Sequence, residues 1–149
     1  MKIGIITDIH ENVSMLEAAL RVADAQGCDE LACLGDIVGY DSRFYNYHFR
    51  RSARQCVSLV RSNCRWVVAG NHDLFAASRL PSWSNGHTFP DHWFKMTPTD
   101  RREASAGLVW SFEGEDPNDL GDEEIDFHNT IPEYEIVSEN GKDMLLTHY

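Results

Sequence analysis

Four short apolar runs in this chain each lead directly into a small polar cluster, and this repeated pattern constrains the fold more than any other feature. Each run has the length and composition of a buried β-strand, and each cluster contains aspartate, asparagine or histidine. The runs and their clusters are residues 3–7 with Asp8-Ile9-His10, 31–34 with Gly35-Asp36, 66–69 with Gly70-Asn71-His72-Asp73, and 144–147 with His148.

Helical segments separate the first three runs. Asn12 is placed to cap a helix whose apolar stripe includes Val13 and Leu16 and which ends near Gly27. Residues 44–63 predict a second helix. The order strand, helix, strand, helix, strand indicates a parallel sheet with right-handed crossovers. We therefore expect an α/β fold in which the polar clusters meet beyond the carboxyl ends of neighbouring strands.

The regular pattern weakens after Asp73. We expect, in chain order, a short helix over 74–80, an irregular excursion over 81–99, a helix from Asp100 through Trp110 with Glu103 in a capping box, a solvated acidic loop over 113–126, and strands 134–138 and 144–148 joined by a turn at Asn140-Gly141.

The excursion carries the aromatic residues Trp83, Phe89, Trp93 and Phe94. Two roles suit these rings. They could stack on a nucleobase, or they could anchor a long loop to the core, which is the commoner use of such residues.

Composition bounds the possible classes of protein. A chain of 149 residues is predicted to form one domain, residues 1–149. Its net charge of −11 argues against nonspecific nucleic-acid binding. Eight of its carboxylates lie in residues 113–126, which contain no lysine or arginine. No apolar run approaches the roughly 18 residues of a membrane span. Because the first residues enter a strand without a charged and apolar leader, we expect a cytoplasmic protein with reduced cysteines.

The polar clusters offer carboxylate oxygens, an amide oxygen and imidazole nitrogens. This mixture of ligands suits one or two divalent metals better than any other cofactor. Taken singly, each residue has a simpler explanation: Asp8 and Asp36 cap helices, Asn71 belongs to a turn, and a single histidine lies on the surface. The four clusters taken together, each after a strand, favour a metal site.

The clusters Asp8-Ile9-His10, Gly35-Asp36-Ile37-Val38-Gly39-Tyr40 and Gly70-Asn71-His72-Asp73, in that order, resemble the first three motifs of the calcineurin-like metallophosphoesterases, and His148 resembles the histidine of the fourth. The resemblance implies a sandwich of two sheets between helices, the first mainly parallel, and two divalent metal ions, whether manganese, iron, zinc or nickel. It implies that Asp8 and His10 hold one ion, Asn71 and His148 hold the other, and Asp36 bridges them.

The resemblance also implies that His72 donates a proton to the leaving group or steadies the phosphate, and Asp73 is placed to orient it. The implied activity is hydrolysis of a phosphate ester by water that the two metals activate, with a small phosphate ester as the partner molecule.

Two departures from the family pattern matter. Phosphoprotein phosphatases of this superfamily carry Asp-Arg-Gly from the position of Gly39, so this chain resembles the small bacterial phosphodiesterase branch instead. The chain also ends at Tyr149, before the Gly-His-x-His pair that gives each metal a further ligand. We therefore expect a C-terminally truncated domain with an incomplete second sheet.

Two other functions are left open. The chain could be a non-catalytic binding or scaffold module that keeps the fold. It could also be a mononuclear hydrolase that uses Asp8, His10 and Asp36 alone.

Overall fold

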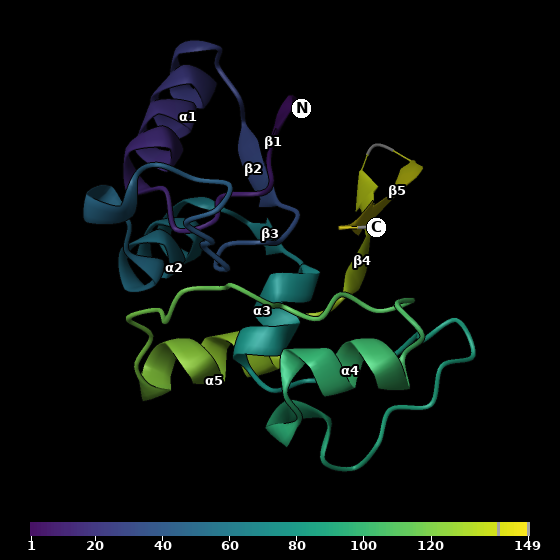
Figure 1. Ribbon diagram of the computed structural model, residues 1–149. Helices are drawn as coiled ribbons and strands as arrows, with labels where there is room; N and C mark the ends of the chain where they lie inside the picture. Colours follow the sequence, from purple (N-terminus) through teal and green to yellow (C-terminus); the bar gives the residue numbers. More distant parts are fainter. Residues whose placement is uncertain (140, 149) are drawn as a thin grey trace.

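The structure is a computed structural model that describes residues 1–139 and 141–148. Strands and helices alternate through the first half of the chain, and a hairpin closes the second half (Figure 1). The elements are β1 (Ile3–Ile6), α1 (Val13–Ala25), β2 (Glu30–Cys33), the 3₁₀ turn η1 (His48–Arg50), α2 (Ala53–Asn63), β3 (Trp66–Val67), α3 (Asn71–Ala76), the 3₁₀ turn η2 (Trp93–Lys95), α4 (Pro98–Ala104), α5 (Asp122–Thr130), β4 (Tyr134–Glu139) and β5 (Lys142–Thr147).

The first sheet is parallel and has the strand order β1-β2-β3. Ile3 pairs with Glu30 at one end of the β1–β2 ladder, and Ala32 pairs with Trp66 between β2 and β3. Because all three strands run in the same direction, their carboxyl ends lie at one edge of the sheet. The polar clusters that follow them are therefore brought to the same edge, as the sequence predicts.

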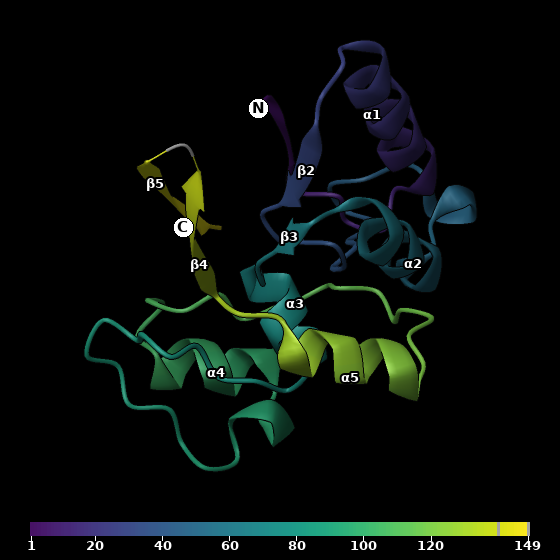
Figure 2. The ribbon, with the colours of Figure 1, turned by 180° about the vertical axis from the view of Figure 1, so that it is seen from behind.

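Helices α1 and α2 cover one face of this sheet (Figures 1 and 2). Asn12 begins α1 by accepting a hydrogen bond from the Met15 amide at 3.1 Å, which is the predicted cap. Ser52 caps α2 in the same way. The core between helices and sheet is built from buried apolar residues, among them Leu16, Cys33, Ile37, Cys56, Val57 and Val60.

The antiparallel hairpin β4–β5 lies on the other side of the parallel sheet, away from α1 and α2 (Figure 2). Val137 and Leu146 pack against Ala32, Trp66 and Val68 in a second core cluster. The predicted fold class, an α/β sandwich with a parallel sheet and a small second sheet, is confirmed. Asn140 of the predicted turn lies outside the described residues.

Two helix boundaries differ from the sequence prediction. Residues 44–52 do not join the helix predicted over 44–63: η1 is a single turn, and α2 begins only at Ala53. The backbone amides of Phe44 and Tyr45 both donate to the Asp41 carbonyl, which forms a turn, and Tyr45 packs 5.0 Å from the His10 ring. Helix α3 starts at Asn71, three residues before the prediction.

The second half of the chain corrects two further predictions. Helix α4 starts at Pro98 with Thr97 as its cap and ends at Ala104, short of Trp110. The acidic segment is a loop only in its first part, because α5 begins at Asp122, and two of its carboxylates face the arginines of α2. Glu123 pairs with Arg61 at 2.7 Å, and Glu124 pairs with Arg54 at 3.5 Å. Opposite charge on α2 thus holds this segment against the domain.

None of the helices described here has the length and apolar character needed to cross a membrane. The four cysteines are free thiols.

The hairpin offers a matched pair of leucines for testing its packing. Leu146 is buried against the parallel sheet, whereas its neighbour Leu145 is 62% exposed. We expect Leu146→Ala to lower the free energy of unfolding by about 2–5 kcal/mol, because it leaves a cavity, and Leu145→Ala to cost under about 1 kcal/mol. Urea unfolding followed by circular dichroism measures both. Equal losses would show that the hairpin does not dock as described.

Candidate metal centre

The loops that follow β1 and β2 are joined by backbone hydrogen bonds. The amides of Asp8, His10 and Glu11 donate to the carbonyls of Gly35, Asp36 and Ile37 at 3.1, 2.9 and 2.9 Å. The pairing of the two strands therefore continues into the loops that carry the candidate ligands. As a result, the positions of Asp8 and His10 depend on that of Asp36.

Three of the candidate ligands have left-handed backbone conformations. Asp8, His10 and Asp36 have φ angles of 54°, 45° and 53°. Residues other than glycine seldom adopt this region, and such conformations persist where the surrounding structure enforces them, often at functional sites. Here the hydrogen bonds between the two loops enforce them.

Asp73 fixes the loop after β2 from beneath. Its fully buried carboxylate accepts hydrogen bonds from the amides of Asp36 at 2.8 Å, Ile37 at 3.0 Å, Val38 at 3.3 Å and Gly70 at 2.9 Å. This corrects the predicted role of Asp73, which holds backbone amides instead of orienting His72. It is a positioning residue, and it acts through the loop that carries Asp36.

Gly35 and Gly70 allow these loops to approach closely. A Cβ atom on Gly35 would lie 2.2 Å from the Gly70 nitrogen, and one on Gly70 would lie 2.1 Å from Asp36 Oδ1. Side chains at either position would therefore force the loops apart. These glycines are required by the packing of the site.

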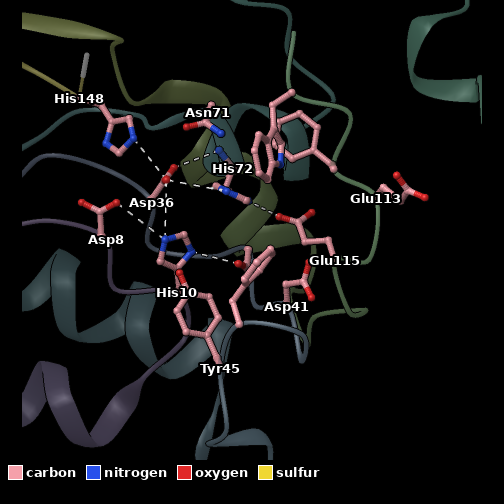
Figure 3. A pocket seen from close by; sticks show the side chains of 14 residues that line it. Asp8, His10, Asp36, Asp41, Tyr45, Asn71, His72, Glu113, Glu115 and His148 are labelled. Atoms are coloured by element: carbon pink, nitrogen blue, oxygen red, sulfur yellow. Dashed lines mark hydrogen bonds and ion pairs between the residues drawn. The ribbon is translucent and has the colours of Figure 1, made fainter. Parts of the chain in front are cut away.

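The candidate ligands converge on Asp36 (Figure 3). Asp36 Oδ2 lies 3.9 Å from His10 Nε2, 4.0 Å from His72 Nε2 and 3.3 Å from His148 Nε2, and His10 Nε2 lies 3.8 Å from Asp8 Oδ1. Asn71 lines the same cavity, whose volume is about 430 Å³. All five predicted ligands thus border one space, which they reach from four separate segments of the chain.

The donor atoms form two groups that share one carboxylate. His10, Asp36 and His72 make one group, and Asp8, Asp36 and His148 make the other. Atoms bound about 2.1 Å from an ion lie at most about 4.2 Å apart, so the distances above suit a cation. The shared Asp36 fits the predicted bridge. The predicted division of the other ligands differs from this grouping, which pairs Asp8 with His148 and His10 with His72.

Backbone carbonyls orient two of the imidazoles. His10 Nδ1 lies 3.0 Å from the Gly39 carbonyl, and His148 Nδ1 lies 2.7 Å from the Leu34 carbonyl. A ring that donates from Nδ1 to a carbonyl turns Nε2 toward the cavity as the metal-binding atom, which is the usual arrangement of ligating histidines. Without a metal, the hydrogen bond to Asp36 raises the pKa of His148 to about 9.

The charge of the cavity also suits cations. Its lining includes carboxylates of Asp8, Asp36, Asp41, Glu113 and Glu115, while no lysine or arginine lines it among the residues that the structure describes. An anionic ligand would be repelled from this space unless positive charge were bound there first. The donor set and its spacing therefore fit one or two divalent metals.

His72 has a carboxylate partner that the sequence analysis missed. Its Nδ1 contacts Glu115 Oε1, so that Nε2 faces Asp36 (Figure 3). Burial lowers the pKa of His72, but the hydrogen bond to Glu115 and the charge of Asp36 outweigh burial and raise it overall. A Cβ atom on Gly39 would lie 2.3 Å from His72 Nδ1, so the glycine leaves room for the ring.

Glu11 is a second residue that the sequence analysis missed. Its buried carboxylate pairs with Arg51 at 2.8 Å and accepts hydrogen bonds from the amides of Gly39 and Tyr40 at 3.3 Å. Burial raises the pKa of Glu11 in spite of Arg51. Glu11 directly follows the first motif, but Glu115 is one of eight similar carboxylates and no spacing marks it out.

Fold and site together describe an α/β sandwich with a cavity whose donor atoms fit divalent metals. The calcineurin-like phosphoesterase superfamily domain matches residues 1–149, and the chain belongs to that superfamily.

The chain is also similar to proteins of known structure or sequence. A metallophosphoesterase from Sphaerobacter thermophilus is 29% identical to this chain, with a TM-score of 0.53. The match covers 93% of this chain and 44% of that protein. A hypothetical protein from Pyrococcus horikoshii shares the fold, at 19% identity and a TM-score of 0.54, covering 96% of this chain and 52% of its own.

An uncharacterized protein of Methanocaldococcus jannaschii is 42% identical over 72 residues, which are 48% of this chain and 26% of that protein. The chain therefore spans about half the length of these solved structures, and the match covers about a quarter of the curated relative.

The Asp73 carboxylate also faces His128 of α5, and this contact predicts a pH dependence of stability. His128 Nε2 lies 3.4 Å from Asp73 Oδ1, and Nδ1 lies 2.7 Å from the Glu124 carbonyl. Burial lowers the pKa of His128, but these partners raise it overall. Because the folded pKa exceeds the unfolded value of about 6.5, protonated His128 stabilises the fold at pH 6.5 and below. This stabilisation is lost as the pH rises through the folded pKa.

We expect the urea midpoint of the chelator-treated protein to fall from pH 6.5 to pH 9, and His128→Gln to reduce that fall. The exposed His92 provides the control, and His92→Gln should keep the profile of the unmodified chain. Parallel profiles for all three proteins would rule out the His128–Asp73 interaction as the cause.

Proposed function

We propose that this chain carries the active site of a metal-dependent phosphoesterase that hydrolyses a phosphodiester with two divalent metals. The observation that carries the proposal is the position of Asp36 Oδ2, which lies 3.9 Å from His10 Nε2 and 3.3 Å from His148 Nε2. A carboxylate shared between two donor groups is suited to bridging two cations. Membership of the superfamily supports the same chemistry.

The residues that would hold the metals are Asp8, His10, Asp36, Asn71 and His148. Manganese, iron, zinc and nickel all accept this mixture of oxygen and nitrogen donors. Bound divalent metals activate water and neutralise the charge of a phosphate ester. They would therefore overcome the repulsion that the carboxylates of the cavity exert on an anionic substrate.

His72 supplies the proton for the leaving group in this proposal. Water attacks phosphorus, the bond to the leaving oxygen breaks, and the imidazolium of His72 protonates that oxygen. Glu115 and Asp36 raise the pKa of the ring, which favours its protonated form, and a well-placed general acid contributes about 10²–10⁴-fold. Glu115 holds the ring through Nδ1 and leaves Nε2 to face the substrate.

The substrate class follows from the second motif. Gly39 stands where the phosphoprotein phosphatases carry an aspartate, which favours a small phosphodiester over a phosphorylated protein. A cytoplasmic location and the lack of nonspecific nucleic-acid binding stay predictions of the sequence.

The first test replaces the shared carboxylate. With manganese or zinc present, we expect Asp36→Asn to lower hydrolysis of bis(4-nitrophenyl) phosphate at least about 100-fold, because it removes charge from both donor groups. Release of 4-nitrophenol measures the rate. Removing metal with a chelator should have a similar effect on the unmodified chain.

Asp126→Asn is the matched control, because Asp126 is exposed on α5 and should leave the rate unchanged. The proposal is wrong if the unmodified chain, the chelated chain and Asp36→Asn all have the same rate. A folded chain that binds no metal and hydrolyses nothing would instead support a scaffold role.

The second test concerns the carboxylate that contacts His72. Glu115→Gln should slow hydrolysis of methyl phenyl phosphate about tenfold or more and that of methyl 4-nitrophenyl phosphate much less, because nitrophenolate leaves without protonation. The ratio of the two kcat values measures this effect. Partial recovery is expected with Glu115→Asp. An equal loss on both substrates would assign Glu115 a purely structural role.

A further inference from the structure

A second cavity adjoins the metal cavity and has a different character. Its volume is also about 430 Å³, which is within the range of small-molecule sites. We call it the aromatic cavity, because its walls include Phe75, Trp83, Phe89, Trp93, Trp110 and Phe112.

The two cavities share part of their walls. Asn71, Trp110 and Phe112 line both. The Phe112 ring lies edge-on to His72, with centroids 5.3 Å apart, and the Trp110 ring lies 6.4 Å from His72. On its other side, Phe112 stacks on Phe75 at 4.0 Å. His72 therefore lies between the donor groups around Asp36 and the aromatic cavity.

The aromatic cavity carries little charge. Arg79 is its only charged lining residue among those that the structure describes, and its guanidinium donates to the backbone carbonyls of His128 and Ile131 at 2.5 and 2.8 Å. The Arg79 guanidinium thus uses hydrogen bonds to hold the backbone of the domain. An uncharged group suits this space better than an anion.

The two aromatic residues Trp93 and Trp83 have different surroundings. Trp93 is 3% exposed and packs edge-on against Phe89 and His87, so it anchors the excursion to the domain. Trp83 is 72% exposed, although it lines the same cavity. Anchoring accounts for Trp93, but it does not account for Trp83, which presents its ring to solvent.

We propose that the aromatic cavity binds an uncharged aromatic ring system attached to the leaving oxygen of the phosphodiester. This inference rests on the proposed function and identifies the class of substrate. Because His72 lies between the two cavities, an ester whose phosphate lies at the metal cavity would direct its leaving oxygen past His72 toward Trp110 and Phe112. Planar rings stack on such aromatic walls, and this is the source of the selectivity.

Binding can be tested separately from catalysis. The chain has four tryptophans, and three of them, Trp83, Trp93 and Trp110, line the aromatic cavity, while Trp66 is buried in the core beneath the hairpin. In ¹⁵N-labelled metal-free protein, 2-naphthol should shift the indole signals of Trp83 and Trp110 and leave that of Trp66 in place. Trp83→Ala assigns its signal and should weaken binding roughly tenfold.

The kinetic test compares methyl 2-naphthyl phosphate with methyl phenyl phosphate, whose leaving groups have similar acidity. We expect the metal-loaded chain to favour the naphthyl ester in kcat/KM, and Trp83→Ala to reduce that preference roughly tenfold. Phe49→Ala is the control, because Phe49 is 99% exposed on η1 and outside the cavity. It should keep the preference of the unmodified chain.

The outcomes separate the two proposals. Hydrolysis without a naphthyl preference, together with unshifted indole signals, would overturn the aromatic site and leave the phosphoesterase proposal standing. The chain could instead hydrolyse neither ester and still show indole shifts that Trp83→Ala weakens. That result would support the aromatic site and overturn the phosphoesterase proposal. Equal effects of Trp83→Ala and Phe49→Ala in both assays would overturn the aromatic site.

Discussion

The buried carboxylate of Asp73 is the interaction on which the site depends. It gathers backbone amides of Asp36, Ile37 and Val38 from one loop and of Gly70 from the next. The loop that it fixes in turn accepts the hydrogen bonds that hold Asp8 and His10. A buried carboxylate without hydrogen-bond donors is strongly destabilising. The loops that supply these donors are therefore held close to Asp73 and to each other. Four donors to a single side chain thus hold three ligand-bearing segments in register.

Much of the fold and most of the candidate ligands could be predicted, because they follow strand ends. Asp8, Asp36 and His148 each stand after an apolar run, and the parallel order of the strands brings such positions to one edge. The role of Asp73 could not be read from its place beside His72, because side chains at adjacent helical positions diverge. Glu115 could not be found either, since only the path of the chain distinguishes it from the other carboxylates of its segment.

The acidic segment shows how tertiary context changes the meaning of a composition. Eight carboxylates in a short stretch are typical of a solvated loop, yet here the arginines of α2 pair with two of them. This attachment carries Glu115 to His72 and places His128 against Asp73. The segment and the rest of α5 therefore contact two neighbouring residues of α3, His72 at the cavity and Asp73 in the interior.

The hydrogen bonds between the loops affect how far the fold depends on a bound metal. Small zinc domains collapse when a chelator removes their ion, because coordination is what folds them. In this chain backbone hydrogen bonds already hold the loops that carry the candidate metal ligands. Gly35 and Gly70 let these loops pack closely. We therefore expect the fold of this chain to depend less on a cation than the fold of a small zinc domain does.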